Sequence, residues 1–107
     1  MAMTIEEKEK CSEIYKLITN RDVPAYQWNE NAANKLAGIV EDILKCTELI
    51  HLIPRGPGND WIWLVTEAYG VIKRRFFSNP HEAYDMCVKT VVYYKLHEVE
   101  IALIGGN

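Results

Sequence analysis

The chain has 107 residues, of which 49% are hydrophobic and 25% are charged, and this composition excludes a disordered protein. Its apolar runs are far shorter than the ~20 residues that a membrane-spanning helix needs. The first ten residues contain three glutamates and no apolar stretch, so we expect no signal peptide. Twelve basic and 15 acidic residues give a net charge of −3, which argues against binding to a nucleic acid duplex. We expect one soluble domain spanning residues 1–107.

The three cysteines indicate the cellular compartment. Cys11, Cys46 and Cys87 are odd in number and widely spaced, so the sequence supports neither a disulfide framework nor a zinc ribbon. Each cysteine falls within an apolar helical pattern, and free cysteine is among the most buried residue types. We therefore expect reduced core cysteines in a cytoplasmic protein.

The first predicted helix begins at Thr4, because Glu7 three residues later completes a capping box. One face of this helix is apolar and consists of Cys11, Ile14, Tyr15 and Ile18. Asn20 and the segment that leads to Pro24 end the helix, because proline cannot continue it.

The second predicted helix begins after Asn29, a residue type that caps helices well. Its apolar stripe consists of Leu36, Ile39, Val40, Ile43, Leu44 and Ile50, while Glu41 and Asp42 lie on the outer face. Gly38 interrupts this pattern, either at a close helix crossing or for no structural reason. Two prolines and two glycines in residues 54–58 then break the helical pattern.

The third predicted helix is capped by Asn59 or Asp60 and is apolar on more than one side. Its main stripe consists of Trp61, Leu64, Val65, Ala68, Ile72 and Phe76. Trp63, Tyr69 and Phe77 fall off this stripe. A helix with this pattern is usually central, or it is covered by a partner.

The fourth predicted helix begins at Pro80, with Asn79 as its cap, and ends before Gly105 and Gly106. Its apolar positions are Tyr84, Val88, Val91, Val92, Leu96, Val99 and Leu103. These four helices predict an all-α, four-helix bundle-like fold in a single domain, with the third and fourth helices supplying the main core.

The sequence contains no recognisable catalytic or metal-binding pattern. His51, His81 and His97 are too far apart for a helical metal pair, and Ser12 and Ser78 have no nucleophile-elbow context. We therefore expect no catalytic residues, no metal and no cofactor.

A small-ligand or nucleotide site is one alternative function. The loop between the second and third helices combines glycines, a cation and two stacking rings, in Arg55, Gly56, Gly58, Asn59, Trp61 and Trp63. It lacks the Lys-Ser/Thr pair of a phosphate-binding P-loop, so a tight turn between helices is the simpler interpretation. A third function is nucleic acid binding through Lys73-Arg74-Arg75. The acidic composition argues against it, and cations also suit a helix C-terminus.

Aromatic residues are the strongest functional signal. Three Trp, six Tyr and two Phe are many for four helices, and exposed aromatic side chains beside arginine are typical of protein interfaces. The predicted interface residues are Trp63, Tyr69, Lys73, Arg74, Arg75, Phe77, Glu41 and Asp42. We expect a small acidic protein-binding module, an inhibitor or accessory protein of the immunity or anti-defence type, that also forms a homo-oligomer through its third and fourth helices.

Overall fold

The computed structural model describes residues 3–46, 61–76 and 93–105. These residues form the α-helices α1 (Ile5–Thr19), α2 (Glu30–Cys46), α3 (Trp61–Phe76) and α5 (Tyr93–Gly105), with a 3-10 turn, η1 (Ala25–Gln27), between α1 and α2. No strand occurs in these three ranges, and the predicted all-α class is confirmed.

Helix α1 has the predicted boundaries because both of its ends are capped. The Glu7 N–H donates to the Thr4 hydroxyl at 3.2 Å, and the Glu7 carboxylate accepts from the Thr4 N–H at 2.8 Å. At the other end, Asn20 adopts a left-handed conformation with φ 60° and ψ 20°, and its N–H donates to the Lys16 carbonyl. Asparagine tolerates this conformation better than most residues. Helix α1 therefore ends at Thr19, five positions before Pro24.

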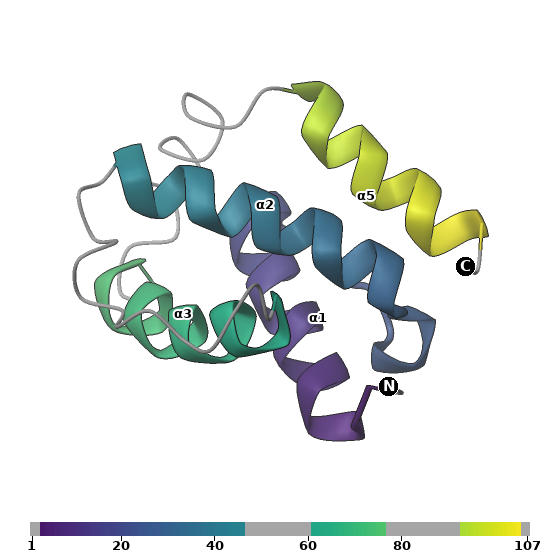
Figure 1. Cartoon of the computed structure of the whole chain (residues 1–107), viewed down its shortest axis with the longest axis horizontal. Helices are drawn as coiled ribbons and strands as arrows, with labels where there is room; N and C mark the ends of the chain where they lie inside the picture. The colour runs from purple at the N-terminus through teal and green to yellow at the C-terminus, as the bar shows by residue number, and fades with distance from the viewer. Residues whose placement is uncertain (1–2, 47–60, 77–92, 106–107) are drawn as a thin grey trace.

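Helix α2 is the centre of the described fold. It packs against α5 on one side and α3 on the other, while α1 packs against α3 and η1 (Figure 1). The predicted cap of α2 is confirmed, because the Asn29 side-chain oxygen accepts from the Ala32 N–H at 2.8 Å.

All four helices contribute buried apolar residues to the described core. The largest buried set comes from α2 and consists of Ala32, Ala33, Leu36, Ala37, Ile39, Val40, Ile43 and Leu44. The other helices bury Cys11, Ile14, Tyr15 and Ile18 (α1), Val65, Ala68, Val71 and Ile72 (α3), and Val99 and Ala102 (α5). Helix α2 contributes most among the described residues because it lies between two helices. Residues 77–92 and several large side chains of α3 lie outside the described part, so the expectation that the third and fourth helices supply the main core stays a prediction.

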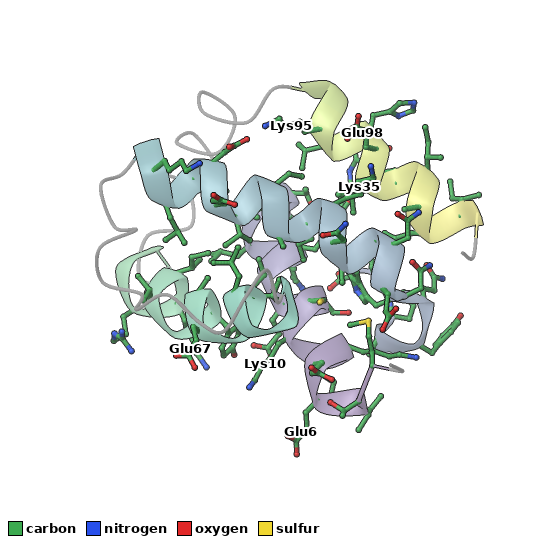
Figure 2. All side chains as sticks on the ribbon, viewed as in Figure 1. Glu6, Lys10, Lys35, Glu67, Lys95 and Glu98 are labelled. Atoms are coloured by element: carbon green, nitrogen blue, oxygen red, sulfur yellow. The ribbon has the colours of Figure 1, made fainter. Side chains whose placement is uncertain are left out.

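Helix α5 runs antiparallel to α2. Lys95 near the start of α5 pairs with Asp42 near the end of α2, and the Asn29 amide donates to the Ala102 carbonyl at 3.1 Å. Figure 2 labels the side chains of Lys95, which pairs with α2, and of the exposed Glu98 one turn later on α5.

Several predictions concern residues outside the described ranges and stay predictions. They are the Ile50 end of the second helix, the break at 54–58, the caps at Asn59, Asp60 and Asn79, the start of the fourth helix at Pro80, and the burial of Cys87. The burial of Cys46 also stays a prediction, because the structure describes this last residue of α2 without its side chain.

Candidate functional site

Two of the predicted interface residues, Tyr69 and Lys73, bind groups within the chain. The Tyr69 hydroxyl donates to the Glu13 carboxylate on α1, and this hydrogen bond raises the pKa of Tyr69 above its ordinary value of 10.0. The Lys73 ammonium lies 5.4 Å from the centroid of the Tyr69 ring and donates to its hydroxyl at 3.3 Å. The cluster joins α3 to α1, and it holds the phenol in its protonated, unreactive form.

The predicted basic cluster is described for two of its three members. Arg74 is exposed, and its guanidinium lies beside Gly70, one turn earlier on α3. Arg75 and Trp63 also belong to α3, but their side chains, like the whole of Phe77, lie outside what the structure describes. Nucleic acid binding through this cluster stays a prediction.

The predicted acidic interface pair, Glu41 and Asp42, is engaged in ion pairs. Glu41 pairs with Lys45 one turn later at 3.0 Å. Asp42 pairs with Lys95 of α5, and both of these side chains are only about a third exposed. The sequence places Asp42 on an outer face, whereas the structure places it at the junction of two helices.

The candidate ligand loop falls largely outside the described residues. Arg55, Gly56, Gly58 and Asn59 precede α3, and Trp61 and Trp63 lie in its first turn with side chains that the structure does not describe. A ligand site at this loop stays a prediction.

A partly buried polar junction that the sequence did not reveal joins α1 to the connector before α2. The Ser12 hydroxyl donates to the Val23 carbonyl at 2.7 Å and accepts from the Trp28 indole N–H at 2.8 Å. Trp28 is 1% exposed, and its ring meets Tyr15 edge to face at a centroid distance of 5.6 Å. The Ser12 hydroxyl donates its only proton to the Val23 carbonyl, and we therefore interpret it as a structural group.

A second polar cluster joins the same connector to α5. The Arg21 guanidinium pairs with the Glu100 carboxylate, and His97 Nδ1 lies 3.8 Å from the other Glu100 oxygen. Burial raises the pKa of Tyr15, and the Glu100 carboxylate raises it further. The sequence could not reveal this cluster, because Arg21 and Glu100 are 79 positions apart.

The nucleophile that the structure describes most clearly is Cys11, and it is unreactive. Burial, with a smaller contribution from Glu7, raises the pKa of the Cys11 thiol to about 12. Since the thiolate is the reactive form, this thiol has almost no nucleophilic fraction at neutral pH. In the described part of the chain, no three His, Cys, Asp or Glu residues gather around a possible metal position.

An exposed apolar surface lies at the C-terminal end of α5. Ile101 and Ile104, three positions apart on this helix, are 56% and 87% exposed. Tyr26 of η1 is 75% exposed, and η1 precedes Asn29, whose amide contacts the carbonyl of Ala102. Figure 1 shows the connector between α1 and α2 at the same end of the molecule as the C-terminal end of α5. We call Tyr26, Ile101 and Ile104 the α5 surface.

The chain was compared with protein families, curated proteins and solved structures, and nothing in any of the three matches it. Within the described ranges, no helix has both the length and the apolar character that a membrane crossing requires.

Proposed function

We propose that the chain is a non-catalytic protein-binding module that docks on a partner protein through the α5 surface. The observation that carries this proposal is the exposure of Ile101 and Ile104 on adjacent turns of one helix. A single exposed apolar side chain is ordinary in a folded protein. Ile101 and Ile104 lie three positions apart on one helix face and together form an apolar patch of the kind that partner proteins cover, and the exposed Tyr26 belongs to the connector at the same end of the molecule.

The polar residues near the α5 surface support the same function. Glu100 is paired with Arg21, so the charge nearest to Ile101 in the sequence is already compensated within the chain. His97 and Glu98 are exposed on the preceding turn of α5. An apolar centre with a polar rim is the usual anatomy of a protein interface.

The size of the α5 surface indicates how a partner would bind. A standard interface buries about 800 Å² on each partner, which is more than three side chains supply. A docked partner therefore covers neighbouring polar residues such as Glu98 as well. A module that binds its partner in this way acts by covering a surface of that partner and catalyses no reaction. Inhibitors and accessory proteins work in this manner.

The experiment replaces the two isoleucines with glutamate. We expect Ile101→Glu/Ile104→Glu to retain the melting temperature, because exposed substitutions change stability by about 0.5 kcal/mol or less. Partner proteins captured from the native host by the unaltered chain and identified by mass spectrometry should be lost from the variant. The dissociation constant of the purified pair should then rise at least tenfold, because the substitution buries charge in an apolar contact.

The matched control is Ile5→Glu, because Ile5 is also an exposed isoleucine, 59% accessible, but lies on α1. This control should bind the captured partner as well as the unaltered chain does. If Ile101→Glu/Ile104→Glu bound the partner as tightly as the unaltered chain does, the α5 surface would not be the docking site.

The sequence analysis also predicts a homo-oligomer, in which the partner would be a second copy of the chain. Light scattering separates the two cases, because a monomer has a mass of 12.3 kDa. A mass near twice that value at tens of micromolar, reduced to one chain by Ile101→Glu/Ile104→Glu, would assign the α5 surface to self-association. If the unaltered chain and the double variant are both monomers, the partner that binds the α5 surface is a different protein.

A further inference from the structure

One side chain, Asn29, binds the ends of two helices at once. Its oxygen accepts from the Ala32 N–H at 2.8 Å, which caps the N-terminus of α2. Its amide nitrogen donates to the Ala102 carbonyl at 3.1 Å, in the last turn of α5. The last four carbonyls of a helix have no partner within that helix, so Asn29 satisfies an end of each helix.

The chemistry of this position favours an amide. A carboxamide carries both an acceptor and donors, whereas a carboxylate can only accept. The partial positive charge at the N-terminus of α2 also lies near the partial negative charge at the C-terminus of α5, and that arrangement is attractive.

Among the side chains of α5 that the structure describes, few add a large buried contact. Val99 and Ala102 are small and fully buried, Leu96 and Leu103 are partly buried, and the side chains of Tyr93 and Tyr94 lie outside the description. Its ion pairs, Lys95 with Asp42 and Arg21 with Glu100, involve side chains that are about a third exposed or more. Exposed ion pairs contribute on the order of 0–1 kcal/mol each.

We infer that α5 opens as a unit while α1, α2 and α3 stay folded, and that Asn29 sets how often it opens. Elements with little apolar burial open at a lower free energy than the core does. Opening uncovers the side of α2 that carries Asp42 and, one turn earlier, the buried Ile39. The inference concerns the isolated chain and does not depend on the proposed docking function.

The variant that tests this inference is Asn29→Asp. Aspartate keeps the acceptor for the Ala32 N–H and suits the N-terminus of α2, but it cannot donate to the Ala102 carbonyl. We expect native-state hydrogen exchange, read by mass spectrometry, to be about tenfold faster for the amides of residues 97–105 than in the unaltered chain. This is the size expected when one hydrogen bond is lost and a carboxylate is placed near the negative end of the α5 dipole. The amides of α1 and α2 should keep their exchange rates.

Asn34→Asp is the matched control, because it makes the same chemical change at an exposed position of α2. It should leave the exchange of α5 unchanged. A second measurement repeats the exchange in dilute urea, where an opening that exposes little surface responds weakly.

Two results would overturn the inference. In the first, α5 amides of the unaltered chain exchange at the same opening free energy and with the same urea dependence as those of α1, which means that α5 opens only when the whole chain unfolds. In the second, Asn29→Asp leaves residues 97–105 unaffected or accelerates exchange equally in every helix.

Discussion

Helices α1 and α5 have similar lengths, but they distribute their apolar residues differently: the exposed isoleucine of α1, Ile5, is its first residue, whereas α5 exposes two isoleucines on one face. Helix α1 buries Cys11, Ile14, Tyr15 and Ile18 to within 2% of complete coverage. Helix α5 buries the smaller side chains of Val99 and Ala102 and leaves Ile101 and Ile104 exposed. The comparison shows that the burial of apolar side chains on a helix of this fold depends on which face carries them, and not on how many the helix contains.

The two helices therefore have different roles in the molecule. Glu6, Glu9 and Glu13 lie on the exposed side of α1, which is typical of a helix whose partners are all within its own domain. Apolar residues on the exposed side of α5 have no such explanation within the described fold. This difference is why we place the docking surface on α5.

The largest expected effect tests the α1 side of this comparison. Trp28→Ala should lower the free energy of unfolding by about 3–5 kcal/mol, because it empties a fully buried site against Tyr15 and removes the indole donor to Ser12. Urea denaturation measures this change. The control is Tyr26→Ala, two positions earlier and 75% exposed, which should change stability by about 0.5 kcal/mol or less.

The milder variant Ser12→Ala keeps this prediction testable if Trp28→Ala does not fold. It leaves the Trp28 N–H and the Val23 carbonyl without a partner, so we expect a loss of about 1–3 kcal/mol. A loss below that of Tyr26→Ala would show that the junction does not stabilise α1.

Alkaline pH should produce the next largest effect, through Cys11. Burial raises the pKa of the thiol from 9.0 to about 12, so above pH 9 the unfolded chain releases a proton that the folded chain retains. The free energy of unfolding should therefore be unaffected by this group below pH 9 and fall by about 1.4 kcal/mol per pH unit between about pH 9 and 12.

Urea denaturation from pH 8 to 11 checks this slope, and Cys11→Ala is the control. The alanine variant should start from a lower stability and lose less of it as the pH rises. Parallel curves for the two proteins would mean that the buried face of α1 is open to water.

The smallest expected effect concerns Gly38, on the exposed side of α2. A Cβ atom there would meet no atom within 4 Å, so Gly38 marks no close helix crossing. Gly38→Ala should raise the free energy of unfolding by about 0.5–1 kcal/mol through helix propensity alone. Gly70→Ala is a useful comparison, because its Cβ would lie 3.4 Å from the Arg74 guanidinium and the gain should be smaller. Thermal denaturation resolves both changes.

Local patterns in the sequence predicted the features that depend on near neighbours. The capping box of Thr4 and Glu7, the buried face of α1 and the cap at Asn29 all involve residues within a few positions of one another. The spacing of Val99 and Leu103 likewise indicated the inner face of α5, and both residues pack in the core cluster.

Contacts between distant segments were not predictable from these patterns. Nothing in the sequence near Asn29 reveals that its amide also reaches Ala102, 73 positions away. Asp42 follows the same helical spacing as an exposed residue, so its ion pair with Lys95 emerges only when α5 is placed on α2. Ile101 and Ile104 lie off the apolar stripe of the fourth predicted helix, and this spacing is the one local signal in the sequence for the α5 surface.

The Ser12 junction also has a consequence for the order in which the chain folds. Its two hydrogen bonds join residues 11 and 16 positions apart, whereas the bonds that hold α5 through Asn29 and Arg21 join residues 73 and 79 positions apart. Closing a short loop loses less chain entropy, and local contacts form faster. We therefore expect α1, η1 and the start of α2 to form the folding nucleus, and α5, which carries the proposed docking surface, to join the folded chain last.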